Sequence, residues 1–568
     1  MVRDGGFRTS LLLSCLICGG HFGRSSALDE HAIQNVFVNP LENDSLPLQK
    51  MVLDRQANRI YLCGKNSLYD LLPNFEARNM VETGPVTEHQ AICELKHGTS
   101  TPDQGRSCIA DSDCKALTIH AARRQLVECT SPNGGRCRLR NLTNIDEMTE
   151  GRSRARQMMS RGSDGTAVAF IGRGARSLDA PLEPALYTGF TAEHEDGVRS
   201  VGMTKGTFSL DDSAGRLLEP VATAVHGTSA MWVLGSAVRR FRIDYVFGFE
   251  HGDYSYWVMR QPVDETDTAR VESVVGRVCQ RTPYYRTYVE LPLQCKKNDV
   301  NYNLVTDAYL SMAGFELARA LGIDTTDKVL FATFVRGTGA QQRRLGEESA
   351  VCVFPIKLID EKVLENVESC FKGRSSSGMS WLTGVTHQCH GLEYLEAKEY
   401  LCSAVFNQPL AGRIAVSAEP AVVLPRGTRA TALAVTTAHH STVVFVGTAQ
   451  GSIVKTVVEA TDAGFIYSTV SVSATPLLAD MEVDTSGQFV LALTSNSVLR
   501  VRVHDCARLN GCTDCLGARD PYCGWCSSDN RCSTQHDCAV DVATDWLPNN
   551  STQCDQHVTR VEPTTDSI

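Results

Sequence analysis

One pattern of short strands and turns returns along most of this chain and limits its fold more than any other feature. In the clearest copy, runs rich in apolar and β-branched side chains occupy residues 51–54, 59–64 and 67–71. The pattern recurs within residues 433–457 and 481–501, and more faintly within 117–139. Each copy predicts a small antiparallel sheet, which alone would expose an apolar face and two edges. When many copies stack around a central axis, the apolar faces are buried between neighbouring sheets and only short, protected edges remain. We therefore expect an all-β fold, namely a β-propeller. A β-sandwich, the alternative, would have shorter and more evenly spaced strands without this return of one pattern.

The repeat is interrupted between about residues 280 and 402. Apolar spacing within this region predicts helices at residues 304–322 and 356–371. Helices inside a propeller indicate an insertion. Disulfide bonds are expected to hold this insertion to its blade. Six cysteines surround it, namely Cys279, Cys295, Cys352, Cys370, Cys389 and Cys402.

A second cysteine group closes the chain, with seven thiols between Cys506 and Cys538. A segment this short cannot bury enough apolar surface to be stable alone, so cross-links must replace the missing core. The Cys-x2-Cys pairs formed by Cys512 with Cys515 and by Cys523 with Cys526 would also suit a zinc site. The cellular compartment decides between disulfides and zinc.

The amino terminus predicts an oxidising compartment. Arg3 and Arg8 precede an apolar run over residues 11–18, and small residues at Ser25 and Ala27 fit cleavage before Leu28. Residues 1–27 are therefore expected to be a signal peptide. Its removal takes Cys15 and Cys18 and leaves 20 of the 22 cysteines, an even number that favours full disulfide pairing over zinc. In that compartment four sequons are expected to accept glycans, at Asn43, Asn141, Asn549 and Asn550.

Composition excludes several classes of function. The net charge of -10 gives no electrostatic reason to bind nucleic acid. No apolar run after residue 27 reaches the roughly 20 residues that span a bilayer, so the chain as written is expected to be secreted. It is expected to be either a complete soluble protein or the front of a longer receptor, with any membrane anchor in a segment outside this sequence.

No motif predicts an enzyme, a cofactor or a metal site. The chain has no Gly-x-Ser-x-Gly elbow, no His-Glu-x-x-His helix and no phosphate-binding Walker loop. The glycine-rich run at 172–177 ends in Ser177 where a dinucleotide fingerprint needs Gly or Ala, and His439-His440 lacks neighbouring ligands. A site in the central channel of a propeller is the alternative that a fold alone leaves open.

Several motifs, in order along the chain, resemble one family. They are Thr83-Gly84-Pro85-Val86, Asn303-Leu304-Val305, Cys352-Val353-Phe354-Pro355, Asn366-Val367-Glu368-Ser369-Cys370, Asn407-Gln408-Pro409-Leu410 and the cassette from Cys515 to Cys526. Together they resemble the amino-terminal ectodomain of a plexin, a sema domain followed by a plexin–semaphorin–integrin (PSI) module. The run Arg140-Asn141-Leu142-Thr143-Asn144-Ile145 resembles the B class of plexins more than the others.

The resemblance implies a seven-bladed propeller with an extrusion on its fifth blade. The expected domains are a signal peptide at 1–27, a sema domain at 28–504, a PSI module at 505–555 and a polar tail or linker at 556–568. The resemblance also implies nine disulfides: Cys93–Cys108, Cys129–Cys137, Cys279–Cys402, Cys295–Cys352, Cys370–Cys389, Cys506–Cys523, Cys512–Cys554, Cys515–Cys532 and Cys526–Cys538. Cys63 and Cys114 remain, and we expect a tenth bridge between them.

For function, the resemblance implies a cell-surface receptor that binds the sema domain of a semaphorin in guidance and cell-migration signalling. Family members meet this ligand at the edge of blades 3 and 4, which corresponds here to residues 187–256. The mixture of arginine and aromatic side chains at Arg239, Arg240, Arg242 and Tyr245 is typical of binding hot spots. The alternative is an alternating strand with Phe241 inward and the arginines merely solvated. A secreted semaphorin-like ligand or soluble decoy is the competing function, and a homo-oligomer or a co-receptor stays open.

Overall fold

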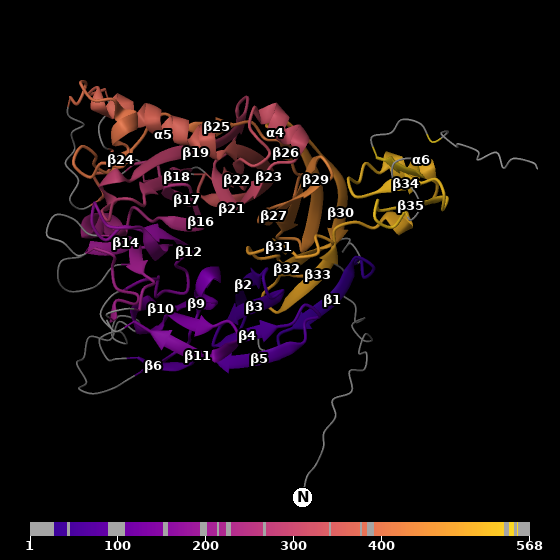
Figure 1. The fold of residues 1–568 in the computed structure, drawn as a ribbon, viewed down its shortest axis with the longest axis horizontal. Coiled ribbons are helices and arrows are strands. Elements are labelled where there is room, and N and C mark those ends of the chain that lie inside the picture. Colours follow the sequence, from indigo (N-terminus) through magenta and orange to yellow (C-terminus); the bar gives the residue numbers. More distant parts are fainter. Residues whose placement is uncertain are drawn as a thin grey trace, which may run out of the picture.

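The computed structural model describes residues 28–41, 46–88, 108–151, 157–193, 201–212, 215–222, 229–264, 268–339, 342–374, 378–382, 391–538, 545–549 and 554. Within them, seven sheets surround a central channel as the blades of a disc, and a smaller module projects beside β30 (Figure 1). The predicted propeller is therefore confirmed. The predicted signal peptide and the polar tail at 556–568 lie outside the described residues.

The first three blades are regular four-stranded sheets. Blade 1 consists of β2 (Leu48–Asp54), β3 (Arg59–Gly64), β4 (Ser67–Leu71) and β5 (Ala77–Glu82). Blade 2 consists of β8 (Cys114–His120), β9 (Gln125–Thr130), β10 (Arg136–Asn141) and β11 (Asn144–Glu150), with the short helices η1 (Ala121–Arg123) and α2 (Pro132–Gly135) in its turns. Blade 3 consists of β12 (Ala167–Gly174), β13 (Glu183–Phe190), β14 (Val201–Ser209) and β15 (Ala230–Leu234). Between blades 1 and 2 in the sequence, β6 (Val86–Glu88) pairs antiparallel with β7 (Cys108–Ala110).

The remaining four blades complete the ring. Blade 4 consists of β16 (Asp244–His251), β17 (Tyr254–Pro262), β18 (Val271–Cys279), β19 (Val289–Lys297) and β20 (Val300–Tyr302), with η3 (Tyr285–Thr287) before β19. Blade 5 consists of β21 (Leu304–Met312), β22 (Lys328–Thr338), β23 (Arg344–Pro355) and β26 (Val422–Val423). Blade 6 consists of β27 (Ala430–Ala438), β28 (Ser441–Thr448), β29 (Ser452–Ala460) and β30 (Ala463–Ser471). Blade 7 consists of β31 (Glu482–Val483), β32 (Phe489–Leu493), β33 (Ser497–Arg502) and β1 (Ile33–Val38).

Blade 7 closes the ring with strands from both ends of the propeller. β1 pairs antiparallel with β33, from Ile33 opposite Val501 to Val38 opposite Ser497. Apolar clusters then join neighbouring blades. Phe37 of blade 7 packs in one cluster with Leu62 of blade 1, for example. Because both faces of the middle strands are covered, β3, β4 and β32 are buried at every position.

The helix expected over residues 304–322 is wrong in its first half. Residues 304–312 form β21, the inner strand of blade 5, and only α4 (Phe315–Leu321) is helical. β21 pairs along its length with β22 and also contacts β27 of blade 6. A strand covered on both sides carries apolar residues without strict alternation, so its pattern resembles that of a buried helix.

The inserted segment begins later in the sequence than the expected residue 280. Strands β19 to β23 continue blades 4 and 5 through most of the range from 280 to 355, and the interruption falls between β23 and β26. We call residues 356–421 the extrusion. It begins with α5 (Ile356–Phe371), as the sequence predicted, and includes η4 (Ala397–Tyr400), β24 (Leu410–Ala411) and β25 (Val416–Ala418). The extrusion therefore belongs to the fifth blade, in agreement with the resemblance.

The extrusion is attached to blade 4 as well as to its own blade. β24 and β25 both pair in parallel with β19, and α5 lies at the rim of the disc near β19 and β25 (Figure 1). Asp360 of α5 accepts hydrogen bonds from the Tyr256 hydroxyl at 2.8 Å and from Arg277 at 2.7 Å. The Cys279–Cys402 disulfide adds a covalent link between the extrusion and β18.

Eight of the ten expected disulfides are present among the described residues. They are Cys63–Cys114, Cys129–Cys137, Cys279–Cys402, Cys295–Cys352, Cys506–Cys523, Cys512–Cys554, Cys515–Cys532 and Cys526–Cys538. The first joins β3 of blade 1 to β8 of blade 2 and is the tenth bridge that the two remaining cysteines suggested. Cys93 and Cys389 lie outside the described residues, while Cys108 and Cys370 are disulfide-bonded.

The carboxyl-terminal module is small and cross-linked. It contains η5 (Cys506–Arg508), α6 (Cys512–Gly517), β34 (Gly524–Cys526), β35 (Arg531–Ser533) and β36 (Trp546–Pro548). Its core is a cluster of Trp525 and Leu516 with the half-cystines Cys506, Cys515, Cys523 and Cys532. Both Cys-x2-Cys pairs are engaged in disulfides, which leaves none of these four thiols for zinc. Among the described helices of the whole chain, none is both long and apolar enough to cross a membrane.

Candidate functional site: the edge of blades 3 and 4 and the central channel

The expected ligand-binding arginines lie where blade 3 passes to blade 4. After β15, the chain forms the single-turn helix α3 (Gly235–Val238) and then a turn that ends at β16. Inside this turn Phe241 is 2% exposed, whereas Arg239 and Arg240 are exposed. The alternative of an alternating strand is wrong for this segment, although Phe241 does point inward. We call residues 239–242 the arginine turn.

Arg242 is held by two carboxylates. Its guanidinium donates to Asp244 at 2.8 Å and to Asp164 at 2.9 Å. Burial lowers the pKa of Arg242, but these two carboxylates outweigh it and raise the pKa above its ordinary value. Asp244 begins β16 of blade 4 and Asp164 precedes β12 of blade 3, so this side chain ties the two blades together. Arg239 and Arg240 are the exposed arginines of this turn, which makes them the candidates for ligand contact.

Tyr245 does not belong to the surface, which corrects the expectation from the sequence. Its side chain is 3% exposed, and its hydroxyl lies 2.7 Å from the Thr204 hydroxyl. Burial raises the pKa of this phenol well above its ordinary value. As the second residue of β16, Tyr245 points into the core between blades 3 and 4 and supports the surface from below.

Lys205 of β14 lies in the same core, and sequence reasoning missed it. It is fully buried, and its Nζ lies 5.1 Å from the centre of the Tyr245 ring and 4.8 Å from that of Tyr288. The ammonium has no hydrogen-bond partner among the described groups. Burial lowers the pKa of Lys205 to about 8, opposed by the nearby charge of Glu290. A lysine within a predicted strand usually faces solvent, so no sequence feature distinguished this one.

The loop before blade 3 forms the acidic border of the same surface. One oxygen of Glu193 accepts hydrogen bonds at 2.7 Å from the Ser160 hydroxyl and from the backbone amides of Arg161 and Gly162. These contacts fix the loop, which presents Asp164 with its side chain 80% exposed. The edge of blades 3 and 4 therefore displays both charges on ordered backbone, an arrangement suited to protein recognition.

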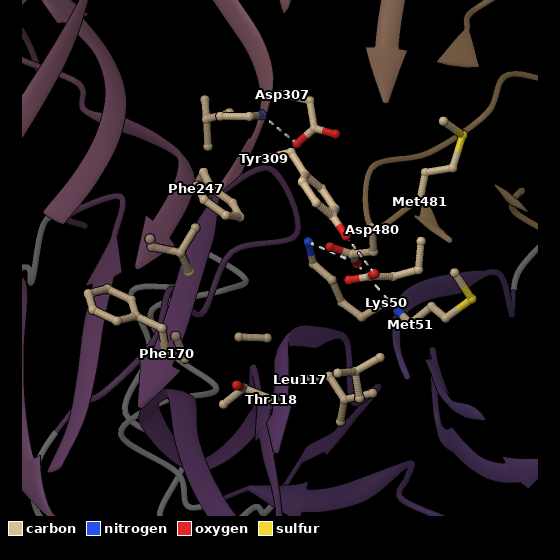
Figure 2. A pocket seen from close by; sticks show the side chains of 18 of the residues that line it. Lys50, Met51, Leu117, Thr118, Phe170, Phe247, Asp307, Tyr309, Asp480 and Met481 are labelled. Atoms are coloured by element: carbon tan, nitrogen blue, oxygen red, sulfur yellow. Dashed lines mark hydrogen bonds and ion pairs between the residues drawn. The ribbon is translucent and has the colours of Figure 1, made fainter. Parts of the chain in front are cut away.

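A second candidate site is the central channel, a cavity of about 350 Å³. Figure 2 shows Phe170 and Phe247 on one wall and Lys50, Tyr309 and Asp480 on another. The charged groups are paired with each other: Lys50 lies 3.5 Å from Asp480, and Arg55 donates to Glu482 at 2.7 Å. The Tyr309 hydroxyl also donates to Glu482, at 3.0 Å.

Asp307 at the channel wall joins blade 5 to blade 6. Its carboxylate accepts the backbone amides of Ala308 at 2.9 Å and Leu433 at 2.8 Å. Burial, together with the charge of Asp480, raises the pKa of Asp307 to about 8. The polar residues that line the channel include Lys50, Thr118 and the carboxylates of Asp307, Asp480 and Glu482. The polar groups of the channel are engaged in holding the inner strands together.

The predicted glycosylation sites remain predictions. Asn141 lies at the end of β10, where its side-chain oxygen accepts the amide of Thr143 at 2.9 Å. Asn549 follows β36. Asn43 and Asn550 lie outside the described residues.

Two protein-family models match this chain, one in the propeller and one in the carboxyl-terminal module. The model of the Sema domain matches residues 305–484, and that of the plexin repeat matches residues 505–557. The chain joins a Sema domain to a plexin repeat, as a plexin amino-terminal ectodomain does. The two domains thus follow each other in the order that the sequence predicted.

The curated relatives of this chain include class A plexins. Plexin-A4 of Danio rerio is 27% identical over 531 residues, which cover 90% of this chain and 27% of that protein. Plexin-A4 of Homo sapiens is 28% identical over 498 residues, covering 86% of this chain and 26% of the relative. The chain therefore spans about a quarter of the length of these relatives. The comparisons point to class A, so the indication of the B class from residues 140–145 is wrong.

Solved structures agree on the fold. The full extracellular region of Plexin A4 superposes with a TM-score of 0.77 at 23% identity, over 90% of this chain and 51% of that one. Drosophila Semaphorin 1a, extracellular domains 1-2, gives a TM-score of 0.61 at 15% identity, over 92% and 99% of the two chains. A structure of Drosophila Plexin A in complex with Semaphorin 1b superposes with a TM-score of 0.59 at 15% identity. The match covers 92% of this chain and 97% of the chain in that structure.

Proposed function

We propose that this plexin-like chain is the extracellular ligand-binding region of a semaphorin receptor. The observation that carries the proposal is the similarity to class A plexins over 86–90% of the chain, with the Sema domain and plexin repeat in the same order. The disulfides support an extracellular location, because such bridges persist in oxidising compartments. Solved structures of this fold include Drosophila Plexin A in complex with Semaphorin 1b, which makes a semaphorin ectodomain the partner to test first.

The proposed contact surface is the edge of blades 3 and 4, with Arg239 and Arg240 as direct contacts. Both arginines are exposed on a turn whose backbone is anchored by Phe241. Binding is by recognition and involves no chemical step on the ligand. Arginine is enriched among the interface residues whose truncation to alanine costs about 2 kcal/mol or more of binding free energy.

The test is surface-based binding of the secreted chain from residue 28 to residue 568 against a panel of semaphorin ectodomains. The unmodified chain should bind at least one of them saturably, and a variant with Arg239→Glu and Arg240→Glu should bind about tenfold or more weakly. Arg319→Glu on α4, whose side chain is 71% exposed, is the matched control and should bind normally. Absence of binding across the panel, by a chain that is secreted and folded, would contradict the receptor function. The competing ligand or decoy function would then be tested against plexin ectodomains.

A further inference from the structure

A short part of the extrusion contacts blade 3, far from the blade that carries it. Leu382 forms an antiparallel bridge with Val233 of β15, and the amide of Leu234 donates to the Trp381 carbonyl at 2.9 Å. β15 is the outer strand of blade 3, so this segment covers an edge that would otherwise have no neighbour in its sheet. The extrusion thereby links blades 3, 4 and 5.

The side chain of Trp381 is the centre of this contact. It is 1% exposed and stacks on Phe241, with ring centres 4.5 Å apart and ring planes 15° from parallel. Met379 and Leu382 are buried in the same cluster, which also contains Ile243 and Val233. A fully buried indole on an aromatic partner is among the strongest apolar contacts that a single side chain can make.

The stacking partner of Trp381 lies inside the arginine turn, between Arg240 and Arg242. The local backbone offers little support of its own, since α3 has four residues and a helix this short is unstable in isolation. The amides of Arg240 and Phe241 donate to the Ala237 carbonyl at 2.9 and 2.7 Å. Two anchors therefore set the position of the turn relative to the blade. They are the hydrogen bonds of Arg242 to Asp244 and Asp164 and the packing of Phe241 on Trp381.

We propose that Trp381 is a positioning residue for ligand recognition: the extrusion places its indole under the arginine turn and holds Arg239 and Arg240 in their binding geometry. The inference rests on the proposed function for its consequence in binding, but the positioning itself is a property of the free chain. Rigid attachment of the extrusion to blade 4 through Cys279–Cys402 and Asp360 makes the support firm.

The positioning is tested first without any ligand, by amide hydrogen exchange of the secreted 28–568 chain. Trp381→Ala should speed exchange of the Arg240 and Phe241 amides about tenfold or more, because their hydrogen bonds open when the turn loosens. Trp381→Phe should stay close to the unmodified chain, since a smaller ring can still stack. Tyr394→Ala, which removes an aromatic ring of the extrusion that is 77% exposed, is the control and should change neither amide. Unchanged exchange in Trp381→Ala would overturn the inference whatever the chain binds.

The consequence for recognition is tested with a semaphorin ectodomain that binds the unmodified chain. Trp381→Ala should weaken binding about tenfold, which corresponds to about 1.4 kcal/mol, and Trp381→Phe should restore most of it. In a double-mutant cycle, Arg240→Glu should cost much less affinity in the Trp381→Ala background than alone, because the arginine has already lost its position. Additive losses would overturn the positioning role while leaving the receptor function intact. If Trp381→Ala is not secreted, Phe241→Leu removes the same stacking from the other side and is judged by the same two measurements.

Discussion

Lys205 lies in the core between blades 3 and 4, where its ammonium group faces two tyrosine rings and makes no hydrogen bond among the described groups. Burial lowers its pKa to about 8, against an ordinary value of 10.5. Between these two pH values the unfolded chain binds more protons at this residue than the folded chain. The contribution of Lys205 to the free energy of unfolding should therefore rise as pH increases from about 8 to 10.5, by an amount on the order of 3 kcal/mol.

Replacement of Lys205 by methionine should remove this pH dependence and raise stability near pH 7, since an apolar chain of similar length no longer buries a charge. Chemical denaturation from pH 7 to 10 measures both effects. Lys296→Met, at an exposed position on β19, is the control and should leave the profile unchanged. A loss of stability near pH 7 in Lys205→Met would mean that the cation–π contacts outweigh the desolvation of the charge.

The positions of single side chains were the part of this site that the sequence predicted least well. The arginine turn was found from its residue types, but Tyr245 was assigned to the surface although it is buried. Lys205 and Trp381 were missed. Their roles depend on which blade each strand neighbours and on a contact between residues 241 and 381, which no local pattern encodes.

The extrusion depends on its link to blade 4, and the Cys279–Cys402 disulfide joins residues 123 positions apart. Loss of a bridge that closes a loop this long removes about 4 to 5 kcal/mol of stabilisation in the chain-entropy account. In a Cys279→Ser, Cys402→Ser variant we expect the extrusion to open locally, because only non-covalent contacts then hold it to blade 4, namely the pairing of β24 and β25 with β19, the packing of α5 and the hydrogen bonds of Asp360.

Limited proteolysis of that variant should cut within residues 356–421 several-fold faster while the blades stay intact. The control is the Cys129→Ser, Cys137→Ser variant, whose bridge spans only 8 positions within the β9–β10 hairpin. It should be cut at the same rate as the unmodified chain. Equal rates in the two variants would show that strand pairing and Asp360 suffice to hold the extrusion.

Repeating strands were predicted well wherever turns separate them clearly, as in blades 1, 6 and 7. α5 was predicted at its full length because its apolar face follows the helical period. β21 was predicted as helix because it is covered by β22 and by blade 6, so its apolar residues do not alternate. The start of the extrusion was misplaced for the same reason.

The propeller and the PSI module meet in a contact that involves blades 6 and 7. The Arg519 guanidinium lies 3.5 Å from the centre of the Phe465 ring on β30, and the ring of Trp546 lies 5.2 Å from that of His439. Lys455 of β29 donates to the carbonyls of Arg502 and Val503 at 2.8 and 3.0 Å, just before the module begins. The negative charge of Asp520 in the module raises the pKa of Lys455, although burial lowers it by more. Burial also raises the pKa of the Asp520 carboxyl to about 6.

These contacts should fix the angle between propeller and module, so that the module acts as a rigid spacer. Arg519→Ala removes a cation–π contact worth about 0.5 to 2 kcal/mol and should broaden the distribution of distances between labels on blade 6 and on the module, measured by single-molecule fluorescence transfer. The thermal unfolding of the propeller should not change, because its core is untouched. Arg531→Ala is the control, since the side-chain hydrogen bonds of Arg531 go to Asp529 and Asp537 within the module. A distribution as narrow as that of the unmodified chain would show that the backbone after β33 and the remaining contacts set the angle without Arg519.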